Sequence, residues 1–270
     1  MELCLMDRLR LAVSLPVFQQ PLKTALKSAA ATGATGVLVD TRHQLKVSEF
    51  SESARRHLGR YLEELGLVLA VTTFPTRRSF SDRQGLEARV EATCQAMTFA
   101  RSLGSDLVTL WLGPLPDGAV DEAGCSPRDL LVDVLNDLAR HGNHVGTLPA
   151  LGASAVDVEE LKALLAKIDQ GPIGLDFDPA GIVGQGRNPV EAYRELHDRV
   201  CHLRVRDMIC EAGGPREVPM GDGEVAWDEM LAVLDEAEYC GWLTAERSAG
   251  GDPAGDVARA VAFVRAIAAG

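Results

Sequence analysis

Eight short aliphatic runs alternate along this chain with longer amphipathic stretches, and few folds accommodate that pattern. The short runs are rich in Val, Leu or Ile and lack the strict apolar–polar alternation of a half-exposed sheet. Both properties are typical of parallel strands that are buried on their two faces. We therefore expect strands at Leu9–Leu15, Gly36–Asp40, Leu67–Thr73, Leu107–Trp111, Val145–Leu151, Ile173–Phe177, Val200–Val205 and Trp242–Glu246.

The stretches between these runs predict helices, because they carry helix start and stop signals. Ser126 is a suitable N-cap with Pro127 at the first helical position, and Gly66 and Gly104 follow the ends of two other stretches. The expected helices are Leu22–Ala31, Ser53–Leu65, Leu86–Leu103, Arg128–Arg140, Val156–Lys167, Pro189–Leu196, Trp227–Glu236 and Pro253–Ile267. Eight strand–helix units in succession predict a closed parallel barrel of the α/β class, the (β/α)8 or TIM barrel.

An open, doubly wound sheet is the structural alternative. Such sheets usually have fewer strands and a glycine-rich turn after the first strand. This chain instead has the sequence PVFQ at Pro16–Gln19, which cannot cradle a pyrophosphate. No linker or change of composition marks a second domain, so we expect residues 1–270 to form one barrel domain.

The charge balance argues against several kinds of partner. With 27 Lys and Arg against 39 Asp and Glu, the formal charge is −12, which disfavours binding to nucleic acid. The longest apolar run, Leu67–Val71, is too short to cross a membrane, and charged residues at Asp7, Arg8 and Arg10 stand where a signal peptide would be apolar. Six cysteines without a C-x-x-C pair indicate reduced thiols in a cytoplasmic protein.

The active sites of such barrels lie at the C-terminal ends of the strands. The side chains expected there mix carboxylates, arginines and aromatic rings, and the candidates are His43, Arg77, Trp111, Asp178, Arg204, Arg206, Asp207 and Glu246. That mixture suits a small polar or anionic substrate better than an apolar one.

Four segments of the sequence resemble one known family. They are Pro21–Asp40 (PLKTALKSAAATGATGVLVD), Gly174–Pro179 (GLDFDP), His202–Asp207 (HLRVRD) and Val218–Glu246, which combines a Gly-x-Gly turn, a Trp and a Gly-Trp-Leu-x-x-Glu strand. Through them the chain resembles the xylose isomerase-like TIM barrels. This is the sugar phosphate isomerase/epimerase superfamily, which also contains ketose epimerases, hydroxypyruvate isomerase and endonuclease IV. The resemblance covers nearly the whole chain, and its last segment is the most specific.

The resemblance implies a divalent-metal site of Glu, Asp, His and Glu, one from each of strands five to eight. Asp178 matches the Asp and Glu246 the final Glu, whereas Arg204 stands at the histidine position. The stretch Thr147–Gly152, where the first Glu is expected, has no acid. An arginine stays protonated and has no lone pair for a metal. We therefore expect no cofactor, and the alternative is a divalent ion (Mn, Mg, Co or Zn) on Asp178 and Glu246.

The arginine at the histidine position and the missing strand-five Glu together suggest that the charge of a side chain replaces the charge of the metal ion. If Arg204 points into the barrel, its guanidinium would lie where relatives hold the metal, paired with Asp178 and Glu246. His202 lies two residues earlier on the same strand face, about 6.6 Å deeper by strand rise, which is too deep for a ligand at the mouth. An arginine carries one positive charge rather than two, which fits the loss of one carboxylate.

The candidate residues on the last three strands also have structural interpretations. Asp178 could be a catalytic acid or a helix cap before Pro179. Glu246 lies on a buried strand, where a carboxylate needs either a partner or a catalytic function. For Arg204, the favoured interpretation is a role in an internal salt-bridge network. Arg206 could bind an anion or join that network.

The candidates on the earlier loops leave similar alternatives. Arg77 could clamp an anion together with Arg78, although adjacent loop arginines are more often solvated. Trp111 could stack on a ligand or fill the mouth of the barrel. His43 could act as a base or be an ordinary loop histidine.

Three functions are compatible with these features. The first is a divergent sugar or sugar-phosphate isomerase/epimerase that binds a small polyhydroxy carbonyl compound at the barrel mouth, with Asp178 and Glu246 as catalytic residues and the usual metal site lost. The second is a catalytically inactive pseudoenzyme that binds a polar metabolite. A DNA-repair nuclease comes last, because it needs a multi-metal cluster and a basic groove. The family often forms homo-oligomers, but one sequence identifies no interface.

Overall fold

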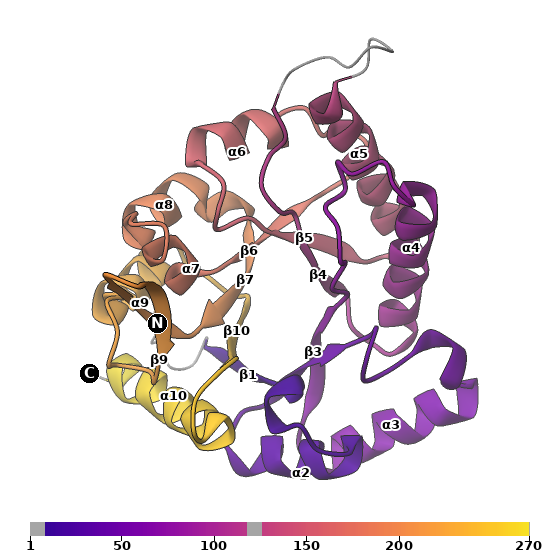
Figure 1. Ribbon diagram of the computed structural model, residues 1–270. Coiled ribbons are helices and arrows are strands. Elements are labelled where there is room, and N and C mark those ends of the chain that lie inside the picture. The colour runs from indigo at the N-terminus through magenta and orange to yellow at the C-terminus, as the bar shows by residue number, and fades with distance from the viewer. Residues whose placement is uncertain (1–8, 118–125, 270) are drawn as a thin grey trace.

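A computed structural model of the protein describes residues 9–117 and 126–269. Its centre is a closed parallel barrel with the strand order β1-β10-β7-β6-β5-β4-β3-β2 (Figure 1). The strands are β1 (Arg10–Ser14), β2 (Gly36–Asp40), β3 (Val68–Thr73), β4 (Leu107–Trp111), β5 (Leu148–Gly152), β6 (Gly174–Phe177), β7 (Val200–Val205) and β10 (Trp242–Ala245). The predicted (β/α)8 barrel is therefore confirmed.

Helices form a ring around the barrel (Figure 1). They are α2 (Leu22–Ala31), α3 (Glu52–Glu64), α4 (Leu86–Ser102), α5 (Pro127–Val145), α6 (Val158–Leu165), α7 (Pro179–Val183), α8 (Pro189–Leu196), α9 (Trp227–Glu236) and α10 (Pro253–Ala268). Short 3-10 helices lie at Leu15–Phe18, Val47–Glu49 and His197–Arg199. None of the helices in the described residues combines the length and the apolar character that a membrane crossing requires.

Apolar side chains pack on both faces of the barrel wall. The larger core lies between the strands and the helices, and it takes Leu11 and Val13 of β1. The residue between them, Ala12, belongs to a smaller cluster that also contains Ala70 and Ala150 and on which Trp242 packs. This alternation assigns the smaller cluster to the barrel interior.

One strand begins later than the sequence predicts. Helix α5 continues to Val145, where we expected β5 to start, and Gly146 ends the helix in the left-handed conformation with φ 80°. Gly142 stays inside the helix, where it is buried and a Cβ would lie 2.5 Å from the carbonyl oxygen of Thr147, and the helix ends only at Gly146, which takes the left-handed conformation. Strand β5 consequently occupies Leu148–Gly152 and ends one residue later than expected.

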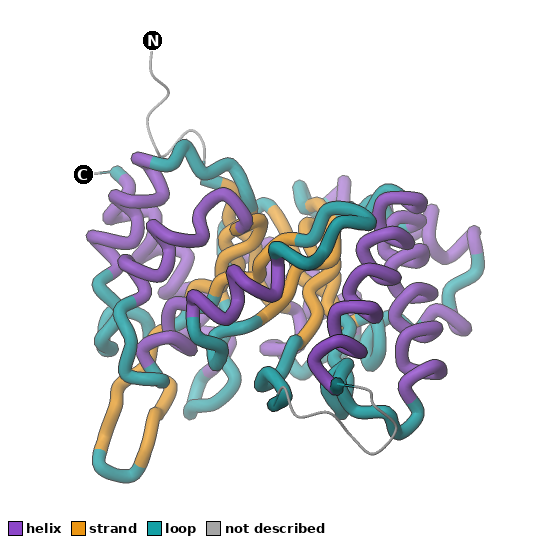
Figure 2. Tube along the Cα trace, turned by 90° about the horizontal axis from the view of Figure 1, so that it is seen from above, coloured by secondary structure: helices purple, strands orange, loops and turns teal. Residues whose placement is uncertain are grey.

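The sequence did not predict α7 or the antiparallel hairpin of β8 (Asp207–Glu211) and β9 (Gly214–Val218). This hairpin projects beyond the rest of the described chain at the end of the barrel where β7 finishes (Figure 2). Most of its residues are only partly buried or exposed. It therefore lacks the aliphatic run by which the barrel strands were found.

Asp207, a predicted substrate-binding residue, holds the base of this hairpin. Its side chain is buried and accepts hydrogen bonds from four backbone N–H groups, those of Met208, Gly221, Gly223 and Val225, at 2.9–3.2 Å. The structure thus gives Asp207 an architectural role, and both of its oxygens are already engaged.

Candidate active site

The polar centre of the barrel is built around Asp176, an inward-facing residue of β6. Its carboxylate is fully buried, and Oδ1 lies 2.7 Å from Nδ1 of His202 on β7. Nε2 of the same ring lies 2.7 Å from Oγ1 of Thr244 on β10. Because an ionised carboxylate only accepts hydrogen bonds, Nδ1 of His202 is the donor, and a neutral ring accepts from the Thr244 hydroxyl.

Arg204 bridges Asp176 and Glu246 above this buried pair. Its Nε and Nη2 donate to Oδ2 of Asp176 at 2.9 and 2.7 Å, and its Nη1 donates to Oε2 of Glu246 at 3.1 Å. The side chains of Arg204 and Glu246 are 25% and 22% exposed, so this end of the network reaches the open mouth. The prediction that Arg204 points into the barrel and pairs with Glu246 is confirmed.

The predicted pairing of Arg204 with Asp178 is wrong. Asp178 is bound by Arg206, whose Nε donates to Oδ1 at 2.9 Å and whose Nη2 donates to Oδ2. Oδ1 of Asp178 also accepts the backbone N–H of Gly181 at 3.1 Å, which confirms the helix-cap interpretation. The partner that sequence reasoning missed is Asp176, which lies two residues before Asp178 on the same face and pairs in register with His202. Because the two aspartates share one strand face, the sequence did offer Asp176 as a possible partner of Arg204.

These pairs hold the arginines and the carboxylate in their charged forms. Burial alone would raise the pKa of Asp176, but Arg204 and then His202 outweigh it and leave that pKa lowered. Burial opposes the charge of Arg204 too, yet the neighbouring carboxylates raise its pKa further. The three carboxylates of the cluster, Asp176, Asp178 and Glu246, exceed its two arginines, Arg204 and Arg206, by one negative charge. Among the described residues, Oε1 of Glu246 has no hydrogen-bond partner, so this charge is most accessible there.

The residues present do not fit the divalent-metal site that the resemblance implies. The Arg204 guanidinium already bridges Asp176 and Glu246, and an arginine cannot ligate a metal. The β5 residue in register with Asp176 is Gly152, where a Cβ would lie 3.6 Å from Oδ2 of that carboxylate. In residues 9–117 and 126–269, no group of three or more His, Cys, Asp or Glu side chains is arranged to hold a metal ion.

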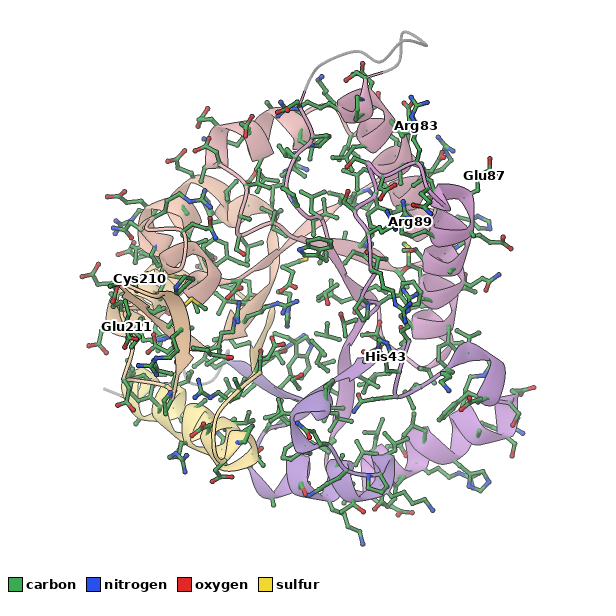
Figure 3. The ribbon with its side chains drawn as sticks, in the orientation of Figure 1. His43, Arg83, Glu87, Arg89, Cys210 and Glu211 are labelled. Carbon is green, nitrogen blue, oxygen red and sulfur yellow. The ribbon has the colours of Figure 1, made fainter. Side chains whose placement is uncertain are left out.

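The remaining predicted residues follow the ends of β2, β3 and β4. Nδ1 of His43 lies 2.7 Å from Oδ2 of Asp40, and the His43 side chain is 63% exposed. Figure 3, in the orientation of Figure 1, shows His43 inside the ring of helices, on the side of α3 and α4. Trp111 is 48% exposed, so it does not fill the mouth and presents an aromatic face to solvent. Arg77 is exposed on the loop after β3.

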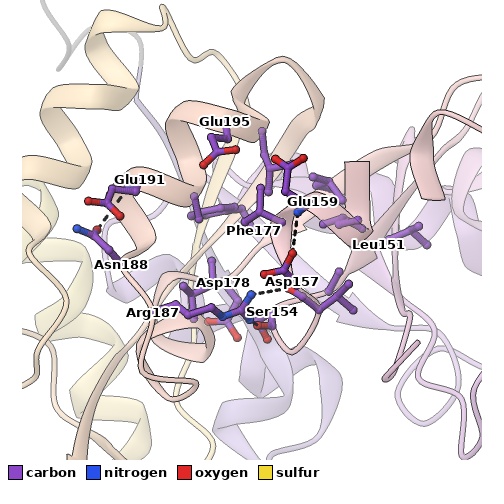
Figure 4. Close-up of a pocket in the computed structure, with 18 of the residues that line it drawn as sticks. Leu151, Ser154, Asp157, Glu159, Phe177, Asp178, Arg187, Asn188, Glu191 and Glu195 are labelled. Carbon is purple, nitrogen blue, oxygen red and sulfur yellow. Dashed lines mark hydrogen bonds between the residues drawn. The ribbon is translucent and has the colours of Figure 1, made fainter. Parts of the chain in front are cut away.

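A cavity of about 430 Å³ lies outside the barrel wall, between α6 and α8 (Figure 4). Asp178 and the outward-facing Phe177 line its inner side. Polar side chains at its rim already make hydrogen bonds within the protein, since Asp157 caps α6 and Arg187 donates to two backbone carbonyls. Glu246 does not line this cavity, so we place the candidate active site at the barrel mouth.

Comparison with known proteins relates most of the barrel to one family. A family model described as "Xylose isomerase-like TIM barrel" matches residues 26–267. The curated relative inosose dehydratase of Clostridium beijerinckii is 28% identical over 137 residues, which are 43% of this chain and 46% of that protein. The chain thus spans about half the length of this relative.

Solved structures show the same fold at low sequence identity. A xylose isomerase domain protein from Planctomyces limnophilus has a TM-score of 0.82 and 21% identity, with 96% of this chain and 97% of that chain covered. A xylose isomerase-like TIM barrel protein from Mycobacterium smegmatis, in complex with magnesium, has a TM-score of 0.77 and 17% identity, with 97% of each chain covered. These likenesses concern the backbone fold.

Proposed function

The chain belongs to the xylose isomerase-like TIM barrel family, and from this we propose that it is a sugar isomerase/epimerase-like enzyme that binds a small polyhydroxy carbonyl compound at the barrel mouth. One observation carries the proposal. Oε2 of Glu246 is held by Arg204, while Oε1 has no partner among the described residues. A carboxylate held beside a fixed cation is suited to removing a proton next to a carbonyl group.

The proposed step moves one proton and one electron pair. Oε1 of Glu246 takes a proton from the carbon beside the carbonyl, and the C–H electron pair forms the double bond of an enediolate. Negative charge then develops on the former carbonyl oxygen. The exposed edge of the Arg204 guanidinium stabilises that charge, which is the task of the metal ion in metal-dependent relatives.

The fate of the enediolate decides the product. Delivery of a second proton to the same carbon, from a group on the opposite face, gives an epimer, and delivery of the proton to the neighbouring carbon gives an isomer. Loss of a neighbouring hydroxide would be a dehydration, the reaction for which the Clostridium relative is named. His43 is the proposed acid for the opposite face, because Asp40 holds its Nδ1–H and the protonated ring can give up the proton on Nε2. After epimerisation Glu246 releases its proton to water and His43 takes one up, which restores both groups.

Two buried residues position Arg204 without touching a substrate. Asp176 binds the guanidinium through two nitrogens, and His202 holds the other oxygen of Asp176. The guanidinium is thus fixed before a ligand arrives, so no reorganisation opposes the reaction.

The test is hydrogen exchange in heavy water, followed by proton NMR. The protein is incubated with a panel of ketoses, their phosphates and inososes, and deuterium uptake beside the carbonyl is measured. We expect Glu246→Gln to lower the exchange rate by at least about 10²-fold, since it removes the base. Glu64→Gln, at an exposed position of α3, serves as the matched control and should exchange like the wild type.

Two outcomes would contradict the enzymatic proposal. Exchange that is unchanged in Glu246→Gln would remove Glu246 from the mechanism. A compound that binds at the mouth without any exchange would instead favour a pseudoenzyme that retains a ligand and no longer turns it over.

A further inference from the structure

Another cavity lies beside the barrel mouth, among the loops after β2 and β3 and the start of α4. Its volume is about 310 Å³, and its lining includes four arginines, Arg42, Arg77, Arg78 and Arg89. The other lining residues are Phe74, Gly85 and two alanines of α4, and none of them is acidic. Four arginines around one cavity are notable in a chain whose formal charge is −12.

Two of these arginines are held in place by backbone and ring contacts. Nη1 of Arg42 donates to the carbonyl of Pro75 at 2.8 Å, and its guanidinium carbon lies 5.4 Å from the centre of the Phe74 ring. Arg89 donates through Nη1 to the carbonyl of Gln84 at 3.0 Å and through Nη2 to the carbonyl of Asp82. Neutral carbonyls do not cancel the positive charge of either guanidinium, and Asp82 is the carboxylate that interacts electrostatically with Arg89.

One buried donor of this cavity lacks a partner. Nε of Arg89 is buried and makes no hydrogen bond within the described chain. A buried N–H without an acceptor costs about 1–3 kcal/mol, more for a charged group. In Figure 3, Arg89 lies on the side of α4 that faces the barrel, whereas Glu87 lies on the outer side.

Acidic groups nearby offset only part of this charge. Nη1 of Arg78 donates to Oδ2 of Asp82 at 2.6 Å, and this hydrogen bond is the main cause of the lowered pKa of Asp82. No ion pair or hydrogen bond of the Arg77 side chain is found among the described residues, and the position is exposed. The cavity therefore keeps a net positive charge from Arg42, Arg77 and Arg89.

The first turn of α4 adds to the same field. Helix α4 has 17 residues and begins after Gly85, which provides no side-chain cap. The N–H of Leu86 donates to the carbonyl of Arg83 at 3.2 Å, and the helix dipole at this end attracts negative charge. Arginine guanidiniums bind multiply charged oxyanions through several N–H donors, which suits a phosphate.

We propose that this cavity binds a phosphate group carried by the substrate, so that the substrate class is a phosphorylated polyhydroxy ketone. The inference rests on the proposed function at the barrel mouth. In the strand order, β3 is four places from β7 around the closed barrel of eight, which is the opposite side. A substrate whose carbonyl end lies at Arg204 and Glu246 would therefore extend its other end toward Arg42 and Arg77.

The first measurement is a titration of the protein with inorganic phosphate at low ionic strength, by calorimetry or ³¹P NMR. We expect Arg77→Ala to weaken phosphate binding by about tenfold, because one charge-assisted contact is lost. Arg78→Ala, a second exposed position, should weaken it further when the two changes are combined. Arg60→Ala, at an exposed position of α3, should leave it unchanged.

The second measurement compares D-fructose 6-phosphate with D-fructose as exchange substrates. A preference of the wild type for the phosphorylated sugar by at least about tenfold, lost in Arg77→Ala, would support the assignment. Phosphate affinity that is equal in Arg77→Ala and Arg60→Ala would overturn the cavity as a site. Phosphate binding without any preference between the two sugars would overturn the substrate class. Glu246→Gln should keep its phosphate affinity while losing exchange, so the two proposals can fail separately.

Discussion

Replacing Gly152 with Glu and Arg204 with His should convert the network at the barrel mouth into a divalent-metal site. The wild-type position 152 has room for a side chain, since a Cβ there would lie 3.6 Å from Oδ2 of Asp176 and 3.7 Å from the carbonyl of Leu110. Both distances are ordinary contacts. The double variant would present carboxylates from β5, β6 and the end of β10, and an imidazole from β7.

The expected stability change follows from the charges. In the wild type, Arg204 is paired with Asp176, which is fully buried, and with Glu246. Breaking a buried pair from one side costs about 3–5 kcal/mol, and each kcal/mol lowers the Tm by about 2–4 °C in a domain near this size. Without metal, the double variant should therefore melt on the order of 10 °C below the wild type.

Metal should then recover most of that loss. An ion bound only to the folded state, at about 100 times its Kd, adds about 2.7 kcal/mol. We therefore expect Mn²⁺ or Co²⁺ to raise the Tm of the double variant by about 5–10 °C. The wild type should show no comparable shift.

Differential scanning fluorimetry with and without metal, together with elemental analysis, measures both effects. Arg204→Met with Gly152→Glu is the matched control, because methionine has no imidazole to complete the site. A folded double variant that takes up no metal, or a wild type that carries stoichiometric metal, would refute the argument that Arg204 stands in for the ion.

Three further predictions follow from buried groups. Asp176→Asn should lower the free energy of unfolding by about 3–5 kcal/mol in urea titrations at pH 7. Although burial alone raises the pKa of Asp176, Arg204 and the hydrogen bond from His202 lower it overall, so its stabilisation is fully present above about pH 3.9 and declines as the pH falls toward the lowered pKa. The gap between wild type and variant should therefore narrow only in strong acid. Gly36→Ala should destabilise the fold by about 1–3 kcal/mol, because the new Cβ would lie 2.6 Å from the Trp242 ring, and an unchanged Tm would contradict this packing. Burial raises the pKa of Cys201 to about 12, so iodoacetamide at pH 8 should alkylate the exposed Cys240 and spare Cys201 in the native protein, as peptide mass spectrometry would show.

The barrel could be predicted because each of its strands is buried on both faces and therefore consists of a run of aliphatic residues. The β8–β9 hairpin has no such run, since its stability comes from backbone pairing and from the carboxylate of Asp207 beneath it. Helix α5 extends beyond its expected end because Gly142 packs inside the helix and the left-handed cap comes only at Gly146. Features that depend on local burial were thus visible in the sequence, and those that depend on distant backbone contacts were not.

The site was predictable in composition and less so in pairing. The position of Arg204 and its contact with Glu246 followed from strand alignment. Its second partner did not, because Asp176 and Asp178 share one face of β6 and the sequence does not say how deep each lies. Which of the two aspartates binds Arg204 depends on the register between β6 and β7, where a bulge shifts the pairing between Leu175 and Asp176.

The Arg204 bridge affects how the barrel depends on the metal ions available in solution. A bound metal ion exchanges with solution, is removed by chelators and competes with other metals that bind the same ligands more tightly. The guanidinium between Asp176 and Glu246 is covalently part of the chain and cannot be exchanged. Its charge is in place as soon as β7 joins the sheet. Under the proposed function, the interior of the barrel needs no metal loading step, and its charge balance is the same whether manganese is scarce or abundant.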